Sequence, residues 1–487
     1  MRNEHFDTLI VGAGLSGIGS AVHLRKRCPG HSFAILEGRA RLGGTWDLFR
    51  YPGVRSDSDM YTLGYSFKPW TAGEAIADGA SILNYIQDTA EEYDLLPHIR
   101  FEHRVADAAW SSAQSRWTLT VQTGAGGELV TMTCNFLLMC SGYYNYAHGY
   151  TPVFPGQDQF AGRMVHPQDW PQDLNYRGKR VVVIGSGATA MTLVPAMAQD
   201  AAQVTMLQRS PTYVVARPRS DALANGLRRL LPAGLAYGLT RWKNVMLGLF
   251  FFRLAKRRPE QFKEGIVKAA AEALPSAFDV RTHFNPRYKP WDQRLCLVPD
   301  GDLFAAIRSG KADVVTDTVA GFEPGGIRLG SGALLPAHVV VTATGLDLLG
   351  FGGMAIRVDG KSVEIAKTLS YKGMMLSGVP NMAYVIGYTN ASWTLKSDLT
   401  GAYVCRVLRH MQRTDSKVCM PALPASGVQT QPWVDFSSGY IQRSLDQFPQ
   451  QGNSTPWRLN QNYLRDLLDL RFRPLADGVL QFSKGAD

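Results

Sequence analysis

The sequence predicts an α/β protein with two doubly wound, Rossmann-like dinucleotide-binding domains and a helical insertion. Near the N-terminus, "FDTLIVGAGLSGIGSAVHLRKR" reads as a strand, a glycine-rich loop and a helix, and "RVVVIGSGATAMTLVPAMAQ" reads the same way. Each is followed by a second apolar strand, "SFAILEG" or "QVTMLQR". Two such βαβ units indicate two domains of this class. A basic, Leu- and Phe-rich stretch interrupts the second unit and is expected to be helical.

The pattern along the chain divides it into five segments. These are the first domain at 1–150, the second at 151–216 with a linker at 151–178, the insertion at 217–290, the second domain again at 291–338 and the first again at 339–487. The first domain is expected to resume because "PNMAYVIGYTNASWTLKSDLTGAYVCRVL" reads as a strand, a loop and a helix. We expect the insertion to form the helical wall of a substrate tunnel.

The first glycine-rich loop has the spacing of a dinucleotide site. Gly12 permits a tight turn, Gly14 lets backbone N–H groups approach a pyrophosphate, and Gly17 packs the helix onto the strand. Glu37 ends the next strand, where a carboxylate accepts hydrogen bonds from ribose hydroxyls. The alternative is a glycine-rich turn without a ligand. The residues expected to contact the cofactor here are Gly12, Ala13, Gly14, Ser16, Gly17 and Glu37.

The second loop differs at the end of its second strand, where Gln208-Arg209 replaces the acid. An acid would repel a 2′-phosphate, whereas an arginine pairs with one bidentately, so this loop predicts NADPH. The alternative is that Arg209 is an ordinary surface charge. The residues expected at this site are Gly185, Ser186, Gly187, Thr189, Ala190, Arg209 and Ser210. One site for ribose hydroxyls and one for a 2′-phosphate favour FAD and NADPH as the pair of cofactors.

Composition excludes several other classes of protein. With 487 residues, 45% of them hydrophobic, the chain can build two or three cores. There is no apolar run of about 18 residues, no secretory signal and no basic–aromatic pattern of a nucleic-acid binder. Six scattered cysteines without a C-x-x-C pair argue against a dithiol centre and a metal site, and a cytoplasmic location is expected. The net charge of +10 is interpreted as a solvated surface, with attraction to anions such as dinucleotide phosphates or an anionic membrane surface as the alternative.

Two sequence motifs resemble those of a known family. "GGTWDLFRYPGVRSD" (43–57) and "FAGRMVHPQDWP" (160–171) resemble the fingerprints of the type I Baeyer–Villiger monooxygenases. Related flavin monooxygenases that oxidise amines and sulfides carry Tyr or Phe where Trp170 stands. The strings "SDSDMYTLGYSFKPW", "NPRYKPWDQRLCLVPDGDLFAAIRSGKADVVTD" and "GYTNASWTLKSDLT" are similar to the branch of ethionamide-activating monooxygenases. In the family, the second string links an FAD domain (here 1–150 and 339–487) to an NADP domain (here 151–216 and 291–338).

The resemblance implies a reaction. NADPH reduces FAD, O2 adds at the flavin C4a carbon, and the resulting peroxide attacks a ketone, which rearranges to an ester or lactone. Lipophilic ketones are the expected substrates, with some sulfoxidation beside them. Two alternatives stay open: a flavin monooxygenase acting on S or N atoms or on long-chain alkanes, and a non-catalytic dinucleotide-binding redox sensor.

The resemblance also implies site residues. Arg294 matches the family's active-site arginine, and Asp57 matches the carboxylate that orients it. Because Asp57 and Asp59 both precede a helix, either could instead be its N-cap, and the fingerprint spacing selects Asp57 for the site. Gln293 stands where many members carry a nicotinamide-contacting lysine. The further residues expected at the flavin are Gly44, Thr45, Trp46, Tyr61 and Val105. The alternative for Trp46 and Tyr61 is that both are core aromatic residues.

The second fingerprint is expected to couple the two domains. Gly162 would allow a close backbone approach, Pro171 would stiffen the connection, and Phe160 and Trp170 would pack it between domains. His166 is interpreted as a hydrogen-bonding residue of the seam. In the insertion, "NVMLGLFFF" and its flanking cations are read as helix core and tunnel wall, with a patch that contacts a membrane as the alternative.

Overall fold

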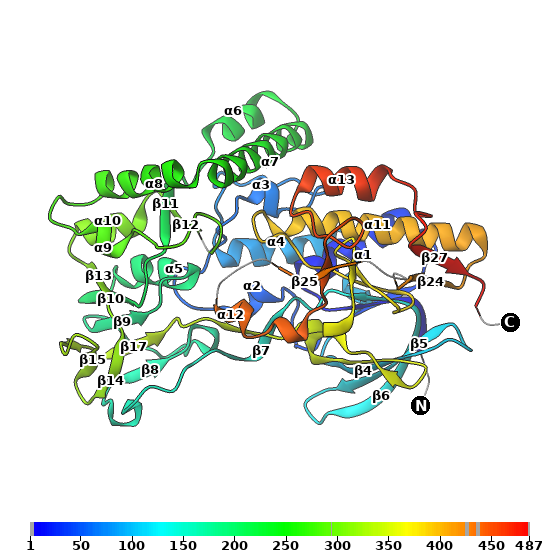
Figure 1. Ribbon diagram of the computed structural model, residues 1–487, viewed down its shortest axis with the longest axis horizontal. Coiled ribbons are helices and arrows are strands. Elements are labelled where there is room, and N and C mark those ends of the chain that lie inside the picture. The colour runs from blue at the N-terminus through cyan, green and yellow to red at the C-terminus, as the bar shows by residue number, and fades with distance from the viewer. Residues whose placement is uncertain (1–3, 294, 424–427, 435–438, 486–487) are drawn as a thin grey trace.

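The computed structural model describes residues 4–293, 295–423, 428–434 and 439–485. Two separate sheets organise the chain, and a helical layer lies along one side of both (Figure 1). The larger sheet has nine strands in the order β20-β19-β4-β5-β6-β1-β2-β3, with β23 paired to β6. The smaller one has five strands in the order β13-β10-β9-β17-β8. This is the two-domain α/β architecture that the sequence predicts.

The larger sheet combines a parallel part with a mixed part, in which β19 pairs parallel with β4 and the other pairings are antiparallel. The parallel strands are β1 (Glu4–Val11), β2 (Phe33–Leu36), β3 (Ile99–Arg100), β6 (Glu128–Met139) and β23 (Met382–Tyr384). The other strands are β4 (His103–Ser111), β5 (Arg116–Thr123), β19 (Ala355–Val358) and β20 (Lys361–Ser362). Since β19, β20 and β23 come from the last third of the chain, that part completes the first domain.

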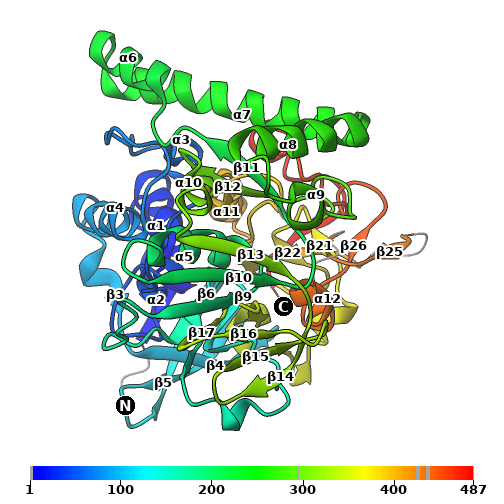
Figure 2. The same cartoon turned by 90° about the vertical axis from the view of Figure 1, so that its left-hand side faces the viewer.

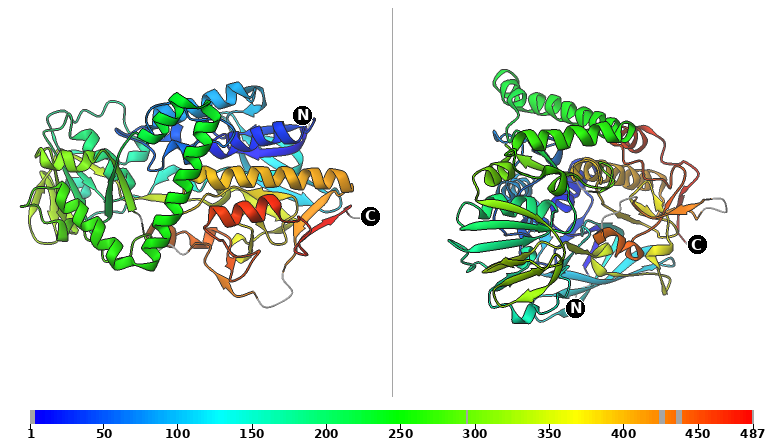
Figure 3. Two further views of the ribbon diagram at one scale, coloured as in Figure 1. Left: turned by 90° about the horizontal axis from the view of Figure 1, so that it is seen from above. Right: turned by 60° about the vertical axis from the view of Figure 1, so that its left-hand side comes forward.

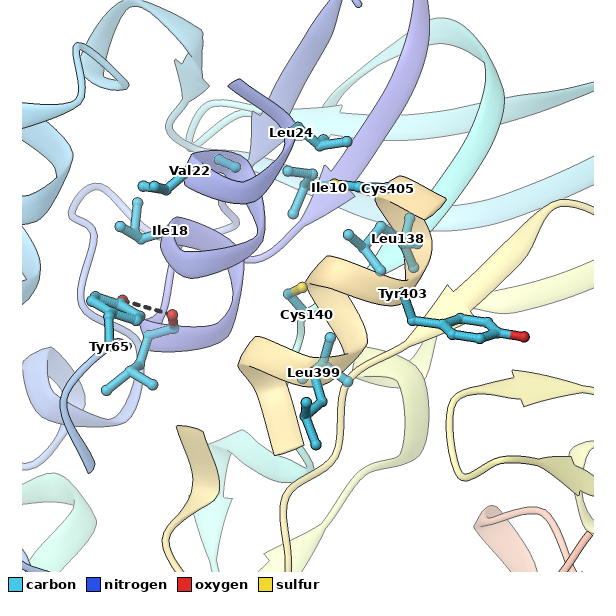
Figure 4. Close-up of a cluster of buried hydrophobic side chains, with 14 of the residues drawn as sticks. Ile10, Ile18, Val22, Leu24, Tyr65, Leu138, Cys140, Leu399, Tyr403 and Cys405 are labelled. Carbon is cyan, nitrogen blue, oxygen red and sulfur yellow. Dashed lines mark hydrogen bonds between the residues drawn. The ribbon is translucent and has the colours of Figure 1, made fainter. Parts of the chain in front are cut away.

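Helices cover one face of the parallel part. They are α1 (Leu15–Arg27), α4 (Gly79–Glu92) and α11 (Trp393–Thr414). Figure 4 shows part of the core around α1 and α11, with Ile18 and Val22 on α1, Leu399 on α11 and Leu138 on β6. The approach of α1 to β1 requires glycine, because a Cβ on Gly17 would lie 1.8 Å from the Gly12 carbonyl oxygen.

The smaller sheet is fully parallel and almost entirely apolar inside. Its strands are β8 (Arg163–Val165), β9 (Arg180–Ile184), β10 (Gln203–Gln208), β13 (Ala312–Thr316) and β17 (Val339–Thr342). It packs against α5 (Ala188–Met197) and α10 (Asp302–Arg308) and carries the meander β14 (Val319–Glu323), β15 (Gly326–Leu329) and β16 (Leu334–Pro336). The boundary predicted between 338 and 339 is wrong, because β17 belongs to this sheet and the return to the first domain follows it.

The insertion forms the helical layer. It leaves the second domain after β11 (Tyr213–Arg217), runs through α6 (Ala222–Leu230), α7 (Ala233–Arg257), α8 (Pro259–Ala273) and α9 (Val280–His283), and returns at β12 (Leu295–Pro299), which pairs with β11. In Figure 2 the long helix α7 runs along the top of the molecule with α6 and α8 beside it.

Two chain segments connect the domains. β7 (Tyr144–Gly149) and β18 (Leu346–Leu348) pair antiparallel as a short ribbon. The remaining described elements are α2 (Thr45–Leu48), α3 (Met60–Leu63), α12 (Gly439–Gln442), α13 (Tyr463–Phe472), β21 (Ser370–Tyr371), β22 (Met375–Leu376), β24 (Val418–Pro421), β25 (Thr430–Gln431), β26 (Gln451–Gly452), β27 (Leu480–Ser483) and six short 3₁₀ turns. No helix within the described ranges is long and apolar enough to cross a membrane.

Candidate active site

A cavity of about 640 Å³ lies where the two predicted sites meet. It is bordered by the first glycine-rich loop, the first fingerprint, the start of α5, the start of β12 and the loop before α11. The predicted site residues that line it are Gly12, Gly14, Ser16, Glu37, Gly44, Thr45, Trp46, Asp57, Val105 and Thr189. Residues from both glycine-rich loops therefore face one space.

The first loop leaves the start of α1 open toward this cavity. Gly14 is the N-cap and offers no side chain to the first helical N–H groups. Gly14 and Gly44 face each other so closely that a Cβ on Gly44 would lie 3.0 Å from the Gly14 Cα. Two facing glycines at an uncapped helix N-terminus leave room and N–H donors for a pyrophosphate, so this cradle fits a dinucleotide such as FAD.

Glu37 directly follows β2 and lies beside the same loop. Its side chain is buried, and its two carboxylate oxygens accept hydrogen bonds from the backbone N–H groups of Ala13 (2.8 Å) and Arg39 (3.0 Å). Burial raises the pKa of the Glu37 carboxyl above its ordinary value, although both hydrogen bonds oppose the shift. A carboxylate has further lone pairs, so Glu37 can still accept hydrogen bonds from ribose hydroxyls.

The first fingerprint is held in place by the carboxylate of Asp47, a residue that the family pattern does not specify. Asp47 is 2% exposed and forms ion pairs with Arg39 (2.8 Å), Arg41 (3.3 Å) and Arg50. Arg39 also lines the cavity beside Tyr146, whose hydroxyl is 3.5 Å from that of Thr45. Asp47 stands within the quoted string, but the spacing of that string gives no sign that it collects three arginines.

The structure distinguishes the two aspartates that precede α3. Asp59 is the N-cap, since it accepts a hydrogen bond from the Thr62 N–H at 3.0 Å, and Asn244 of α7 donates to it. Asp57 lines the cavity instead, which is the position that the fingerprint spacing predicts for the site residue. Arg294 lies outside the described residues, but Cys296 and Leu297 just after it line the same cavity.

Tyr61 does not lie where we expected it. Its side chain is fully buried, its ring packs 6.0 Å from the Tyr237 ring of α7, and it is not among the cavity residues. The turn of α3 rotates Tyr61 away from Asp57 and toward the insertion. Ala13 and Gly17 are also buried behind the loop, where they contribute backbone and close packing rather than a surface.

The strand that follows the second glycine-rich loop and α5 ends in a buried glutamine, which an exposed arginine follows. Gln208 is buried and donates hydrogen bonds to the His283 carbonyl and the Thr316 hydroxyl, whereas Arg209 is exposed. Arg209 has no ion pair within the part of the chain that the structure describes. The N-cap of α5 is Gly187, again without a capping side chain, and Ser186 bonds to the Ser210 carbonyl at 3.1 Å. This arrangement suits a 2′-phosphorylated dinucleotide.

Gly185 and Ala190 of the second loop pack against neighbouring parts of the second domain. A Cβ on Gly185 would lie 2.3 Å from the Ala343 carbonyl oxygen, so only glycine allows this approach of the loop to the end of β17. Ala190 is fully buried against the second sheet. Thr189 is the predicted residue of this loop that reaches the common cavity.

The second fingerprint lies at the crossing between the domains. His166 Nδ1 accepts a hydrogen bond from the Gln168 N–H, and Nε2 is 3.2 Å from the Gly345 carbonyl. The tautomer that satisfies both contacts carries its proton on Nε2. Burial lowers the pKa of His166, which favours this neutral form. Phe160 differs from the expectation, because it packs beneath the second sheet with Phe322 rather than between the domains.

An aromatic wall of the cavity was not predicted from the sequence. The indole Nε1 of Trp393 donates a hydrogen bond to the Ser16 hydroxyl at 2.7 Å, and the Tyr143 ring stacks on Trp393 at 5.2 Å. Tyr388 lines the cavity nearby. The string "GYTNASW" suggested a branch of the family, but nothing in it shows contact with a loop 377 residues away.

The insertion does not line this cavity within the described ranges, so the expected tunnel wall is not found there. Its contribution is indirect, since Val245 of α7 packs against Tyr388 and Leu395. Much of "NVMLGLFFF" is also exposed rather than in a core, because α7 has only one face against the body of the protein.

Known proteins resemble this chain over its whole length. The FAD-containing monooxygenase EthA of Mycobacterium tuberculosis is 54% identical over 482 residues, which cover 99% of this chain and 98% of that protein. The flavin-binding monooxygenase-like family profile matches residues 75–226, and a Rossmann-like NAD(P)-binding profile matches 10–70.

Solved structures share the fold. A steroid monooxygenase bound to NADP matches with a TM-score of 0.71 and 22% identity, covering 86% of this chain and 88% of its own. Cyclohexanone monooxygenase in an open form matches with a TM-score of 0.74 and 20% identity, covering 86% and 90%. This chain belongs to the FAD-containing monooxygenases that include EthA, and the solved structures show that it shares their two-domain fold.

Proposed function

We propose that this monooxygenase uses NADPH and O2 to insert one oxygen atom beside a ketone carbonyl, giving an ester or lactone, NADP⁺ and water. The observation that carries the proposal is the single cavity that joins the Glu37 loop, Asp57 and Thr189 of the second loop. Two cofactors, one bound at each loop, would thus meet each other and the substrate in one cavity.

FAD would bind along the first loop. The N–H groups at the start of α1 would hold its pyrophosphate, and Glu37 would accept hydrogen bonds from its ribose. NADPH would bind at the second loop, with Arg209 on the 2′-phosphate. Bound FAD supplies the redox chemistry, taking a hydride from NADPH and activating O2.

The side chains of the cavity would set the environment of the reaction. Trp46, Phe49, Met191 and Phe351 line it and exclude water, which strengthens every electrostatic contact inside. The attack on a ketone develops negative charge on the carbonyl oxygen, and a fixed cation stabilises such charge best. By its position in the family motif, Arg294 would supply that cation and Asp57 would orient it; Arg remains charged when water is removed.

Sulfides are a second substrate class under this proposal, because the same cavity can admit a soft sulfur atom. The experiment that separates the two is product analysis by gas chromatography and mass spectrometry. The FAD-loaded protein would be given NADPH, O2 and 2-dodecanone, with thioanisole in a parallel reaction. Decyl acetate is the expected ketone product, with methyl phenyl sulfoxide as a lesser activity.

Two variants sharpen this test. Arg294→Ala is expected to abolish the ester while flavin stays bound, and Arg287→Ala, an exposed arginine of the same segment, is expected to leave it unchanged. Sulfoxide without ester from the wild type would replace the ketone assignment with a heteroatom monooxygenase. A protein that takes up no FAD would contradict the proposal altogether.

A further inference from the structure

The outer face of α7 carries a row of large apolar side chains in solvent. Leu235, Leu239, Trp242, Met246 and Phe250 follow one another at intervals of three or four residues and are between 45% and 59% exposed. This spacing places them on one side of the helix. The opposite side is buried through Tyr237, Arg241 and Val245, so only one side of α7 is covered by the body of the protein.

The exposed row continues onto neighbouring helices. Leu230 of α6 is 82% exposed, and Leu468 and Phe472 of α13 are 60% and 67% exposed. The Trp242 ring lies 6.0 Å from that of Tyr463 at the start of α13, and Figure 3 shows α13 beside α7 when the molecule is seen from above. We call the surface formed by α6, α7 and α13 the helical face.

This concentration is unusual for a protein surface. Sixteen large apolar side chains are exposed among the described residues, and eleven of them belong to the helical face. These are Leu223, Leu230, Leu235, Leu239, Trp242, Met246, Leu247, Phe250, Phe251, Leu468 and Phe472. Isolated exposed apolar residues need no explanation, but a contiguous group of this size marks an interaction surface.

The charge of the helical face identifies the partner. Residues 222–258 contain eight Lys or Arg residues and no Asp or Glu; of these cations, Arg241, Lys243 and Lys256 pair with Asp398, Asp221 and Asp292 from outside this range. Arg253 and Arg257 continue the apolar row of α7 at the same spacing, are exposed, and have no ion pair within the part of the chain that the structure describes. On α13, Asp466 and Asp469 are buried while Arg465 and Arg471 are exposed. The face therefore presents apolar side chains bordered by cations.

A second copy of this chain fits the face poorly. An isologous dimer would place the same surface patch against itself, and here that would bring arginines of both copies together without an acid from 222–258 to neutralise them. An anionic lipid surface offers both complements at once, since phosphates pair with arginines and the acyl-chain boundary accepts Trp, Phe and Leu.

We infer that the helical face docks the protein onto an anionic phospholipid membrane, with α7 lying parallel to the surface. The apolar row of α7 enters the boundary between headgroups and acyl chains, and Arg253 and Arg257 contact lipid phosphates. This inference concerns a docking surface and does not depend on which substrate the cavity oxidises.

Vesicle sedimentation tests it with the FAD-loaded full chain. Vesicles of phosphatidylcholine mixed with phosphatidylglycerol are expected to sediment the protein at low salt, and vesicles of phosphatidylcholine alone are expected to bind it at least about tenfold more weakly. Trp242→Ser/Phe250→Ser and Arg253→Glu/Arg257→Glu are each expected to lower the partition coefficient on the anionic vesicles by at least about tenfold. Bound flavin absorbance shows that each variant is folded.

Matched controls lie outside the helical face. Leu129→Ser/Leu334→Ser removes equally exposed apolar side chains, and Lys361→Glu/Lys417→Glu makes the same change of charge; both are expected to bind vesicles like the wild type. Wild-type protein that stays in the supernatant with anionic vesicles at low salt would overturn the inference. So would a dimer in sedimentation velocity that Trp242→Ser/Phe250→Ser converts to a monomer without any vesicle binding, since the face would then belong to a second copy.

Discussion

The Nε1–H of Trp393 donates to the hydroxyl of Ser16 at 2.7 Å, which joins the start of α11 to the first glycine-rich loop. Ser16 lies in the first turn of α1, where the FAD pyrophosphate is proposed to bind. The two halves of the discontinuous first domain thus meet at the cofactor loop, and the position of that loop depends on both.

Replacing Trp393 by Phe is expected to weaken FAD binding. The variant keeps an aromatic ring against Tyr143 but loses one hydrogen bond, which corresponds to a rise in Kd of roughly threefold to tenfold. Titration of the apoprotein with FAD, followed by flavin fluorescence, measures this. Trp110→Phe is the matched control, since it removes the hydrogen bond to Ser112 at 3.1 Å and neither residue lines the cavity. Equal Kd values for Trp393→Phe and wild type would show that Ser16 needs no such anchor.

Replacing Arg209 by Ala is expected to reduce the preference for NADPH over NADH. Loss of a charge-assisted contact to the 2′-phosphate should raise KM for NADPH by roughly tenfold to a hundredfold and leave KM for NADH nearly unchanged. Steady-state oxidation of both nucleotides measures the two constants. Arg177→Ala changes another exposed arginine of the same domain, one that pairs with Asp200, and should alter neither. A parallel rise for NADH would mean that Arg209 acts on the fold rather than on the phosphate.

Replacing His166 by Ala is expected to uncouple NADPH oxidation from oxygenation. His166 joins the Gly345 turn to the Gln168 backbone, so its loss loosens the crossing between the domains. We expect the amount of oxygenated product per NADPH to fall severalfold, with hydrogen peroxide accounting for the rest. Product and peroxide are measured together in one reaction. A wild-type yield per NADPH would contradict a coupling role.

The free energy of unfolding of the apoprotein is expected to fall as the pH rises because of Glu37. Burial raises the folded pKa of Glu37 above its usual value of 4.5, so the native state holds this proton more tightly than the unfolded chain. The stabilisation is complete below pH 4.5 and is lost as the pH rises through the folded pKa. Between the two pKa values the loss approaches about 1.4 kcal/mol for each step of one in pH. The Glu37→Gln variant has no carboxyl group at this position and is expected not to lose stability in this way.

Urea unfolding of apo wild type and apo Glu37→Gln at several pH values measures the difference. The free energy of unfolding of the wild type should fall relative to that of the variant as the pH rises. Bound FAD should reduce this slope, because ribose hydroxyls donate to the ionised carboxylate. Parallel pH profiles for the two apoproteins would show that the pKa of Glu37 is not raised in the folded state.

The predictions about the site rest largely on local motifs. The two glycine spacings, Glu37, Arg209 and the choice of Asp57 over Asp59 all depend on short stretches whose backbone geometry follows from residue type. The fold class follows from the same βαβ patterns. The return of the chain to the first domain also follows from the sequence pattern. The exact boundary does not, because nothing in the buried "VVVT" strand β17 indicates that it joins the second sheet.

Long-range contacts were beyond sequence reasoning. Trp393 meets Ser16, and Asp47 gathers Arg39, Arg41 and Arg50, only through the folded backbone. Tyr61 follows Asp57 by four residues, yet the turn of α3 directs it toward Tyr237 instead of the cavity. The apolar run of the insertion was read as core because periodicity alone does not show how many faces of a helix are covered.

Isotope labelling tests the central claim most directly. The FAD-loaded protein would convert 2-dodecanone with NADPH under isotopically labelled dioxygen, and mass spectrometry would locate the label. Decyl acetate that carries one labelled oxygen atom is expected, formed in proportion to the NADPH consumed. Unlabelled ester, or labelled oxygen found only in hydrogen peroxide, would contradict oxygen insertion beside a ketone as the function of this cavity.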